Sequence, residues 1–344
     1  MSTVSEDSRE SEPDATQKAS GNSPLTDVHI SFKRWLLKTS RNPYVTFSSL
    51  VQPIIFFVLM AEVLGAIVGG ALSQTVGGGV HYVTYLTPAI VIQSALAAAA
   101  VSGIGLVDDM ETGMFDKTLI SPMHRGAMFL GKVLSEVVRI TVQTLVILLL
   151  GYLMLALESG VSPSQFLQTG VAGVVGVVGI TVLFGGVFMA YSNIVALVTR
   201  DREATIMIAN LLTFPLLFVS SAFVPLEALP GWIQTVAVVN PITYGVDGIR
   251  ALMLGEDVLS VFEVTAFGGL WNTVVPAVVV LLGFTLVLGS LAVRLLSSES
   301  GTRSRAAILP KTQAGRHRTQ PAGSATTNEH ICGSCRYQHT PCRL

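Results

Sequence analysis

Apolar runs of about twenty residues recur along this chain, and they constrain its fold more than any other feature. A helix needs about 20 residues to cross a hydrocarbon core of about 30 Å. Only 12% of the residues are charged, whereas soluble domains carry about 25%. The mean hydropathy of +0.61 agrees with this deficit. The sequence therefore predicts an integral membrane protein.

Six of these runs are long enough to span a bilayer, and we expect an all-α fold built on them. Every Lys and Arg except Arg250 lies before the first run, around the connections between the second and third or the fourth and fifth, or around and after the sixth. Such residues concentrate on the cytoplasmic side of membranes. The pattern predicts a multi-pass plasma-membrane protein with both termini in the cytoplasm and spans at about 45–70, 82–107, 133–157, 171–198, 204–224 and 271–296.

The N-terminal part is predicted to contain a tail and then a helix. Residues 1–26 are polar and have neither a basic leader nor a cleavable apolar segment, so a disordered cytoplasmic tail is expected. Residues 27–41 place basic side chains around one side of a helix and apolar side chains on the other, namely Val28, Phe32, Trp35 and Leu36. We expect this helix to lie in the interface with its basic side toward the head groups; the alternative is a cytosolic amphipathic helix.

Residues 299–344 form a second polar and basic segment, which is predicted to be a disordered cytoplasmic tail. It holds a group of possible zinc ligands: Cys332, Cys335, His339 and Cys342. Only one Cys-x-x-Cys pair is present and little chain surrounds it, so a tail without metal is the preferred interpretation.

A charged segment from Val107 to Val133 separates the second and third predicted spans. Acidic residues come first and basic residues follow. Its last eight residues, Gly126–Val133, resemble a nucleotide-binding phosphate loop, but Val133 stands where such a loop needs Ser or Thr to hold magnesium. A membrane span also follows it, so we expect no nucleotide and no other cofactor on this chain.

The connection from Pro225 to Leu270 is too interrupted by proline and polar residues to cross the membrane. Its two short apolar pieces, 231–239 and 241–254, predict a re-entrant or interfacial helical hairpin on the outer face. An ordinary surface loop is the alternative. The residues expected to shape this hairpin are Pro230, Trp232, Asn240, Pro241, Tyr244, Asp247 and Arg250.

Glu62 is the one acidic residue deep within a predicted span. An ionised carboxylate there costs about 2.5–3.5 kcal/mol on insertion scales, so such a residue usually faces a bundle interior or a water path. Glu62 is therefore a candidate for the translocation path, with a structural, hydrogen-bonded Glu as the alternative.

Two stretches carry a family resemblance. One holds Asp109, Glu111 and Gly113 and continues through Leu119 and Ser121–Pro122 to the third span. The other runs from Pro225 to Gly255, with a Leu-Pro-Gly-Trp sequence followed by Asn-Pro-Ile-Thr-Tyr and an Asp–Arg pair. Over residues 27–298 the chain resembles the permease subunits of type-2 ATP-binding-cassette exporters, particularly the daunorubicin-resistance-type branch.

This resemblance implies a six-span permease domain at 27–298 that pairs with a second permease subunit and docks on a separate cytoplasmic ATPase. ATP and Mg would bind to that ATPase, and this chain would not be an enzyme. The loop between spans two and three would form a coupling helix that contacts the ATPase. The positions that the resemblance assigns to this contact are Asp109, Glu111, Gly113, Phe115, Leu119 and Pro122.

Two further hypotheses compete with an ATP-driven export permease. An ion-gradient-driven carrier or channel would transport without nucleotide and would depend on Glu62. A non-transporting membrane anchor or assembly subunit would show neither transport nor ATPase coupling.

Overall fold

The computed structural model describes residues 23–41, 43–75, 81–120, 125–159, 166–261 and 267–308. Contacts divide the chain into two units, Met1–Gly301 and Thr302–Leu344, and the following concerns the first. The regular structure of the described residues consists of helices, with no strand among them. This is the all-α class expected from the apolar runs.

Among the described residues, five helices contain a stretch long and apolar enough to cross a membrane. They correspond to five of the six predicted spans. The stretches are Phe47–Ala66 in α2 (Pro43–Thr75), Tyr82–Glu111 in α3 (the same residues), Gly126–Leu157 in α5 (Arg125–Ser159), Gly170–Thr199 in α7 (the same residues) and Trp271–Leu295 in α11 (Trp271–Ile308).

The helix that corresponds to the remaining predicted span, 204–224, is shorter than predicted. Helix α8 covers Arg202–Phe218 and has 17 residues. At its end the side-chain amide of Asn240 donates hydrogen bonds to the carbonyl oxygens of Leu216 and Val219, at 2.6 and 2.7 Å. These are carbonyls that the end of a helix leaves without a partner. A helix of this length reaches about 26 Å, slightly less than a hydrocarbon core.

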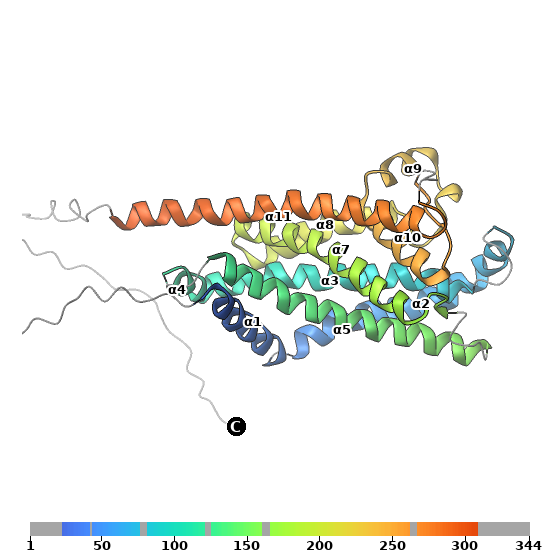
Figure 1. Ribbon diagram of the computed structural model, residues 1–344, viewed down its shortest axis with the longest axis horizontal. Helices are drawn as coiled ribbons and strands as arrows, with labels where there is room; N and C mark the ends of the chain where they lie inside the picture. Colours follow the sequence, from blue (N-terminus) through green and yellow to red (C-terminus); the bar gives the residue numbers. More distant parts are fainter. Residues whose placement is uncertain are drawn as a thin grey trace, which may run out of the picture. The chain divides into compact units, whose positions relative to one another are not determined.

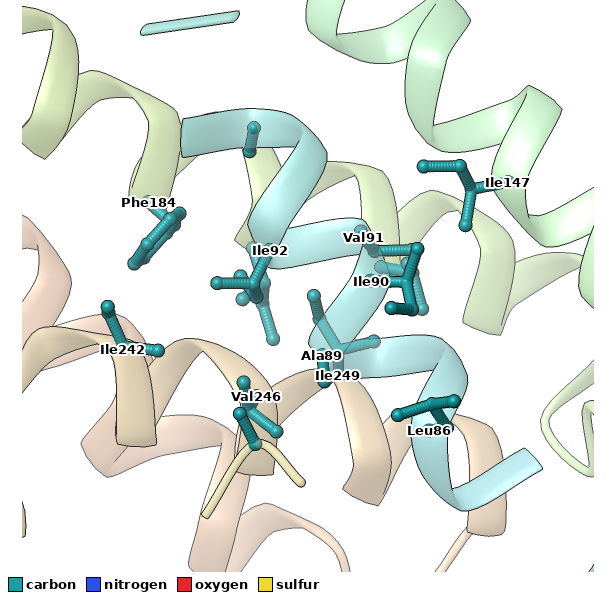
Figure 2. Packing of buried hydrophobic residues seen from close by; sticks show 14 of the residues in the cluster. Leu86, Ala89, Ile90, Val91, Ile92, Ile147, Phe184, Ile242, Val246 and Ile249 are labelled. Atoms are coloured by element: carbon teal, nitrogen blue, oxygen red, sulfur yellow. The ribbon is translucent and has the colours of Figure 1, made fainter. Parts of the chain in front are cut away.

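Helix α3 forms the centre of the unit and packs against α2, α5, α7 and α10 (Pro241–Leu254). Figure 2 shows side chains of α3, including Leu86, Ala89 and Ile92, facing Ile242, Val246 and Ile249 of α10. Close approach is possible because Gly245 lies at this contact: a Cβ there would be 2.9 Å from Ile92 and 3.0 Å from Phe184.

The connection after α8 folds into short helices: the 3-10 helix η1 (Leu226–Ala228), then α9 (Gly231–Ala237) and α10. Asn240 caps α10 by accepting a hydrogen bond from the backbone of Ile242, and Gly255 ends it with φ +71°. Every residue of α10 is buried, which is not how an ordinary surface loop packs.

Helix α1 (Pro24–Arg41) and the short α4 (Met114–Ile120) lie at one end of the helix bundle, and α9 and α10 lie at the other (Figure 1). The four apolar side chains expected on one face of α1 do not share one environment. Trp35 is buried, whereas Leu36 is exposed. Two of its basic residues, Arg34 and Lys38, bind a carboxylate of α3 instead of projecting only toward head groups.

Candidate functional site: the α3–α4–α5 end of the bundle

A tight turn joins α3 to α4. The backbone N–H of Thr112 donates to the carbonyl oxygen of Asp108, and that of Gly113 donates to Met110, both at 3.1 Å. Gly113 has φ +68°, in the left-handed region that favours glycine, and a Cβ there would meet no atom within 4 Å. The backbone angle therefore explains the glycine, because space does not require it.

Phe115 fixes α4 to the bundle. Its side chain is 5% exposed and packs in a small cluster with Leu106 and Val107 of α3 and Ala196 and Leu197 of α7. Met114 and Lys117, on the same short helix, are exposed. Helix α4 thus presents one face to the protein and another to the outside.

Of the residues assigned to an ATPase contact, Glu111 is exposed, Gly113 is half-buried and Phe115 is buried. Asp109 is also buried. Leu119 lies in α4, and Pro122 lies outside the described residues. The structure therefore places Asp109, Glu111, Gly113 and Phe115 together at one end of the bundle, and of these Glu111 is the exposed one.

Asp109 holds α1 against α3. One carboxylate oxygen is 2.9 Å from Nη2 of Arg34, and the other is 2.7 Å from Nζ of Lys38. Lys38 also donates to the carbonyl oxygen of Gly105 at 3.2 Å. A carboxylate bound by two cations and shielded from water is more stabilising than an exposed pair. Sequence reasoning missed this contact because its partners are about 70 residues apart.

Helix α1 also packs closely on α5. The hydroxyl of Ser31 donates to the carbonyl oxygen of Met128 at 2.7 Å. A Cβ on Gly131 would lie 2.5 Å from the Cβ of Ser31 and 2.6 Å from the backbone N of Phe32. Glycine is therefore needed at this crossing.

A stripe of buried charges follows one face of α5: Lys132, Glu136 and Arg139. Their spacing of four and three residues places them on one side of the helix. Lys132 donates to the carbonyl oxygen of Ser102 at 2.9 Å and to the side chain of Asn193. Glu136 and Arg139 form an ion pair within α5, and Arg139 also donates to the carbonyl oxygen of Ala98. Through the contacts of Lys132 and Arg139, the stripe joins α5 to α3 and α7.

The sequence contained a signal for this stripe, because the three charges recur at helical spacing where the third predicted span begins. Interpreting Lys132 and Arg139 as flanking charges concealed it. Glu136 is thus a carboxylate within the apolar stretch Gly126–Leu157, in addition to Glu62 in Phe47–Ala66.

Glu62 lies in α2 and is exposed in the single subunit. Gln52 is also exposed on that helix, and the apolar Ile55 and Leu59 lie between them in sequence and are exposed too. The spacing of these four residues fits one face of a helix. Glu62 therefore points away from the interior of the described bundle.

At the other end of the bundle, Asp247 and Arg250 form a buried ion pair with 3.3 Å between Oδ1 and Nη1. The carboxylate also accepts hydrogen bonds from the hydroxyls of Ser221 and Ser260, each at 2.6 Å. Burial raises the pKa of Asp247 above its ordinary value, while Arg250 and the hydrogen bonds from Ser221 and Ser260 act in the opposite direction. Arg250 also stacks on the Tyr85 ring, with its Cζ 3.9 Å from the ring centroid.

The other hairpin residues have structural positions. Pro230 caps α9, and Pro241 occupies the first turn of α10 beside the cap residue Asn240. The Tyr244 hydroxyl donates to the carbonyl oxygen of Val238 at 2.7 Å, whereas Trp232 is 66% exposed. The Tyr244 contact lies within the α9–α10 connection, and the Asn240 side chain joins this connection to the end of α8.

In the part of the chain that the structure describes, no three His, Cys, Asp or Glu side chains are grouped so that they could hold a metal ion. The candidate zinc ligands Cys332, Cys335, His339 and Cys342 lie outside the described residues.

Comparison with known proteins points in one direction. Residues 26–254 match the family described as ABC-2 type transporter. The chain is 25% identical to a putative transport permease, ycf38, of Cyanophora paradoxa, over 71% of this chain and 80% of that protein. It is 26% identical to the daunorubicin resistance ABC transporter permease protein DrrB1 of Streptomyces coeruleorubidus, over 60% of this chain and 67% of that one. It is also 26% identical to the probable doxorubicin resistance permease DrrC of Mycobacterium tuberculosis, over 67% and 78% of the two chains.

Proposed function

Because the chain belongs to the ABC-2 type transporter family, and is thus a multi-pass transport permease, we propose that it forms the membrane-spanning subunit of an ATP-driven exporter. A separate cytoplasmic ATPase would bind ATP and Mg and would dock on the α3–α4–α5 end. Two relatives are named for resistance to daunorubicin and doxorubicin, which favours an efflux role.

The observation that carries this proposal is the attachment of α4. Phe115 packs against α3 and α7, and two backbone hydrogen bonds hold the turn at Gly113. A push on the outer face of α4 would therefore be transmitted to two membrane helices rather than absorbed by a mobile loop. Glu111, Met114 and Lys117 are exposed there and are the residues that we assign to the ATPase contact.

In this proposal, Asp109 and Phe115 have a different role from the exposed residues that contact the ATPase. Asp109 fixes α1, and Phe115 fixes α4, so both would transmit the displacement without touching the ATPase. Such residues affect coupling more than they affect the affinity between the two subunits.

For the topology, we propose six crossings with α8 as the fifth and both termini in the cytoplasm of a cell-membrane protein. The distribution of Lys and Arg supports this arrangement. Helix α8 is short for a span, but small changes in bilayer thickness accommodate such a mismatch at modest cost.

A second permease subunit would complete the translocation path. Polar side chains on apolar helices are exposed in the single subunit at Gln52 and Glu62 of α2 and at Asn210 of α8. Contact of these groups with lipid tails would be costly. Their exposure supports a second copy, or a water-filled path between two copies, against these faces.

Co-purification tests the docking. A tagged permease should retain its ATPase through affinity purification, and the charge reversal Glu111→Lys should release it while leaving membrane insertion intact. Lys33→Glu, which reverses an exposed charge on α1, should retain it. Equal retention by Glu111→Lys and the unaltered chain, or nucleotide-independent transport by the chain alone, would favour the carrier or channel hypothesis instead.

A further inference from the structure

A cavity of about 120 Å³ lies where α1, α3, α5 and the beginning of α8 meet. This cavity is separate from the exposed face of α4, because no residue of α4 lines it. Its wall combines cations, an aromatic ring and carboxylates, contributed among others by Trp35, Lys38, Asp108, Glu136, Arg139 and Arg202.

Arg139 is the buried cation of this cavity, with 7% of its surface exposed. It pairs with Glu136, and its Nη2 donates to the carbonyl oxygen of Ala98 at 2.5 Å. Its Nε has no hydrogen-bond partner. A buried guanidinium N–H without an acceptor is costly, so this wall of the cavity favours an occupant that carries acceptor oxygens.

The local charge balance favours an anion. The cavity wall itself carries three cations (Lys38, Arg139 and Arg202) and two carboxylates (Asp108 and Glu136). Two of the cations are accessible: 40% of the Lys38 side chain and 54% of the Arg202 side chain are exposed. Both could turn toward a ligand without leaving the protein surface.

The remaining wall suits a lipid. Val101 and Ile104 of α3 provide apolar surface, and the Trp35 ring is bordered by Lys38, whose Nζ is 4.8 Å from the ring centroid. Trp is enriched where membrane helices meet the head groups. The cavity lies beside Asp108, near the end of the apolar stretch of α3, and next to α1, which exposes Leu36 and Leu37.

We propose that this cavity binds the phosphate of a membrane phospholipid, with Lys38, Arg139 and Arg202 as the cations that hold it. The apolar side chains of α1 and α3 would contact the beginning of the acyl chains. A bound lipid would join α1 to α3, α5 and α8, so membrane composition would affect the stability of this end of the bundle.

The test uses the full-length protein in detergent micelles. The thermal unfolding midpoint is measured with phosphatidylglycerol, with diacylglycerol of the same acyl chains and with inorganic phosphate, and retained lipid is counted by native mass spectrometry. The double variant Lys38→Gln/Arg202→Gln is compared with Lys33→Gln/Arg41→Gln, which removes two exposed charges from α1 outside the cavity wall. The single variant Arg202→Gln, which removes only one of these two cations from the cavity wall, is measured in the same way.

Phosphatidylglycerol should raise the midpoint of the unaltered protein and of the Lys33/Arg41 control by several degrees, and diacylglycerol should not. The rise should fall by at least half in Arg202→Gln, and retained lipid should fall at least fivefold in the double variant. The readout is the shift caused by lipid, measured against the midpoint of the same variant without lipid. Equal lipid shifts in all variants would overturn the proposal, as would a rise produced fully by inorganic phosphate alone.

Discussion

At Gly131, α5 approaches α1 so closely that a single methyl group would collide with Ser31 and with the backbone of Phe32. Gly126 lies five residues earlier on the same helix, and a Cβ there would meet nothing within 4 Å. The same change of residue type therefore has opposite consequences at two positions on one helix.

We expect Gly131→Ala to destabilise the protein by about 1–3 kcal/mol, because the added methyl group must displace α1. Gly126→Ala should be neutral or slightly stabilising, since alanine favours a helix more than glycine does. Thermal unfolding midpoints in detergent would rank the two variants. A Gly131→Ala protein as stable as Gly126→Ala would show that α1 is not packed on α5 in this way.

The Asp247 carboxylate is the centre of the polar contacts that hold α10. Replacing it by Ala would leave the Arg250 guanidinium buried without its ion-pair partner, which should cost about 3–5 kcal/mol. The exposed carboxyl of Glu256 provides the comparison, because Glu256→Gln should change stability by less than about 0.5 kcal/mol. The amount of folded protein recovered after mild heating distinguishes the two; equal recovery would be the contrary result.

At the scale of the secondary-structure elements, the C-terminal end of α3 binds α1 and leads directly into α4. Asp109 binds α1 through two cations, and Glu111, two residues later, faces outward. The end of one helix thus serves both an internal contact and an exposed surface.

Asp109→Asn and Glu111→Gln separate these roles. Removing the charge of Asp109 weakens both ion pairs, so α1 should become accessible to protease and the unfolding midpoint should fall. Glu111→Gln should leave both properties unchanged and weaken only ATPase binding. Limited proteolysis between α1 and α2 would report the difference, and equal cleavage of the two variants would contradict it.

Phe115→Ala should uncouple the ATPase without releasing it. The substitution removes a buried anchor at a local cost of about 3–5 kcal/mol, so α4 would no longer transmit force to α3 and α7. Met114→Ala, on the exposed face of the same helix, should instead lower the affinity for the ATPase. Binding and stimulated hydrolysis measured on both variants would test this; loss of binding in Phe115→Ala with coupling intact in any residual complex would oppose it.

Elements with a local pattern could be predicted from the sequence, and contacts between distant segments could not. Apolar runs predicted the long helices, and the Asn240–Pro241 pair correctly marked the start of α10. Asn240, more than twenty residues later in the chain, supplies the hydrogen bonds at the end of α8, and the local sequence of α8 does not predict this contact. The Asp109 ion pairs likewise became visible only when α1 and α3 were placed together.

At the scale of the whole molecule, the described unit has two polar centres. The helices around them, α1 with α4 and α9 with α10, lie at opposite ends of a membrane-sized bundle (Figure 1). One lies around α1, α3, α4 and α5, and the other around α10. Helix α3 contributes Asp109 to the first centre and Tyr85 to the second, so it is the element that connects them.

ATP hydrolysis by the proposed partner ATPase tests the central claim most directly. The two subunits are reconstituted together in proteoliposomes, with the unaltered permease, Glu111→Lys or the Lys33→Glu control. The account predicts that the unaltered permease and the control raise the hydrolysis rate several-fold, and that Glu111→Lys does not, although it inserts equally well. Equal stimulation by all three permeases would contradict docking through the α3–α4–α5 end.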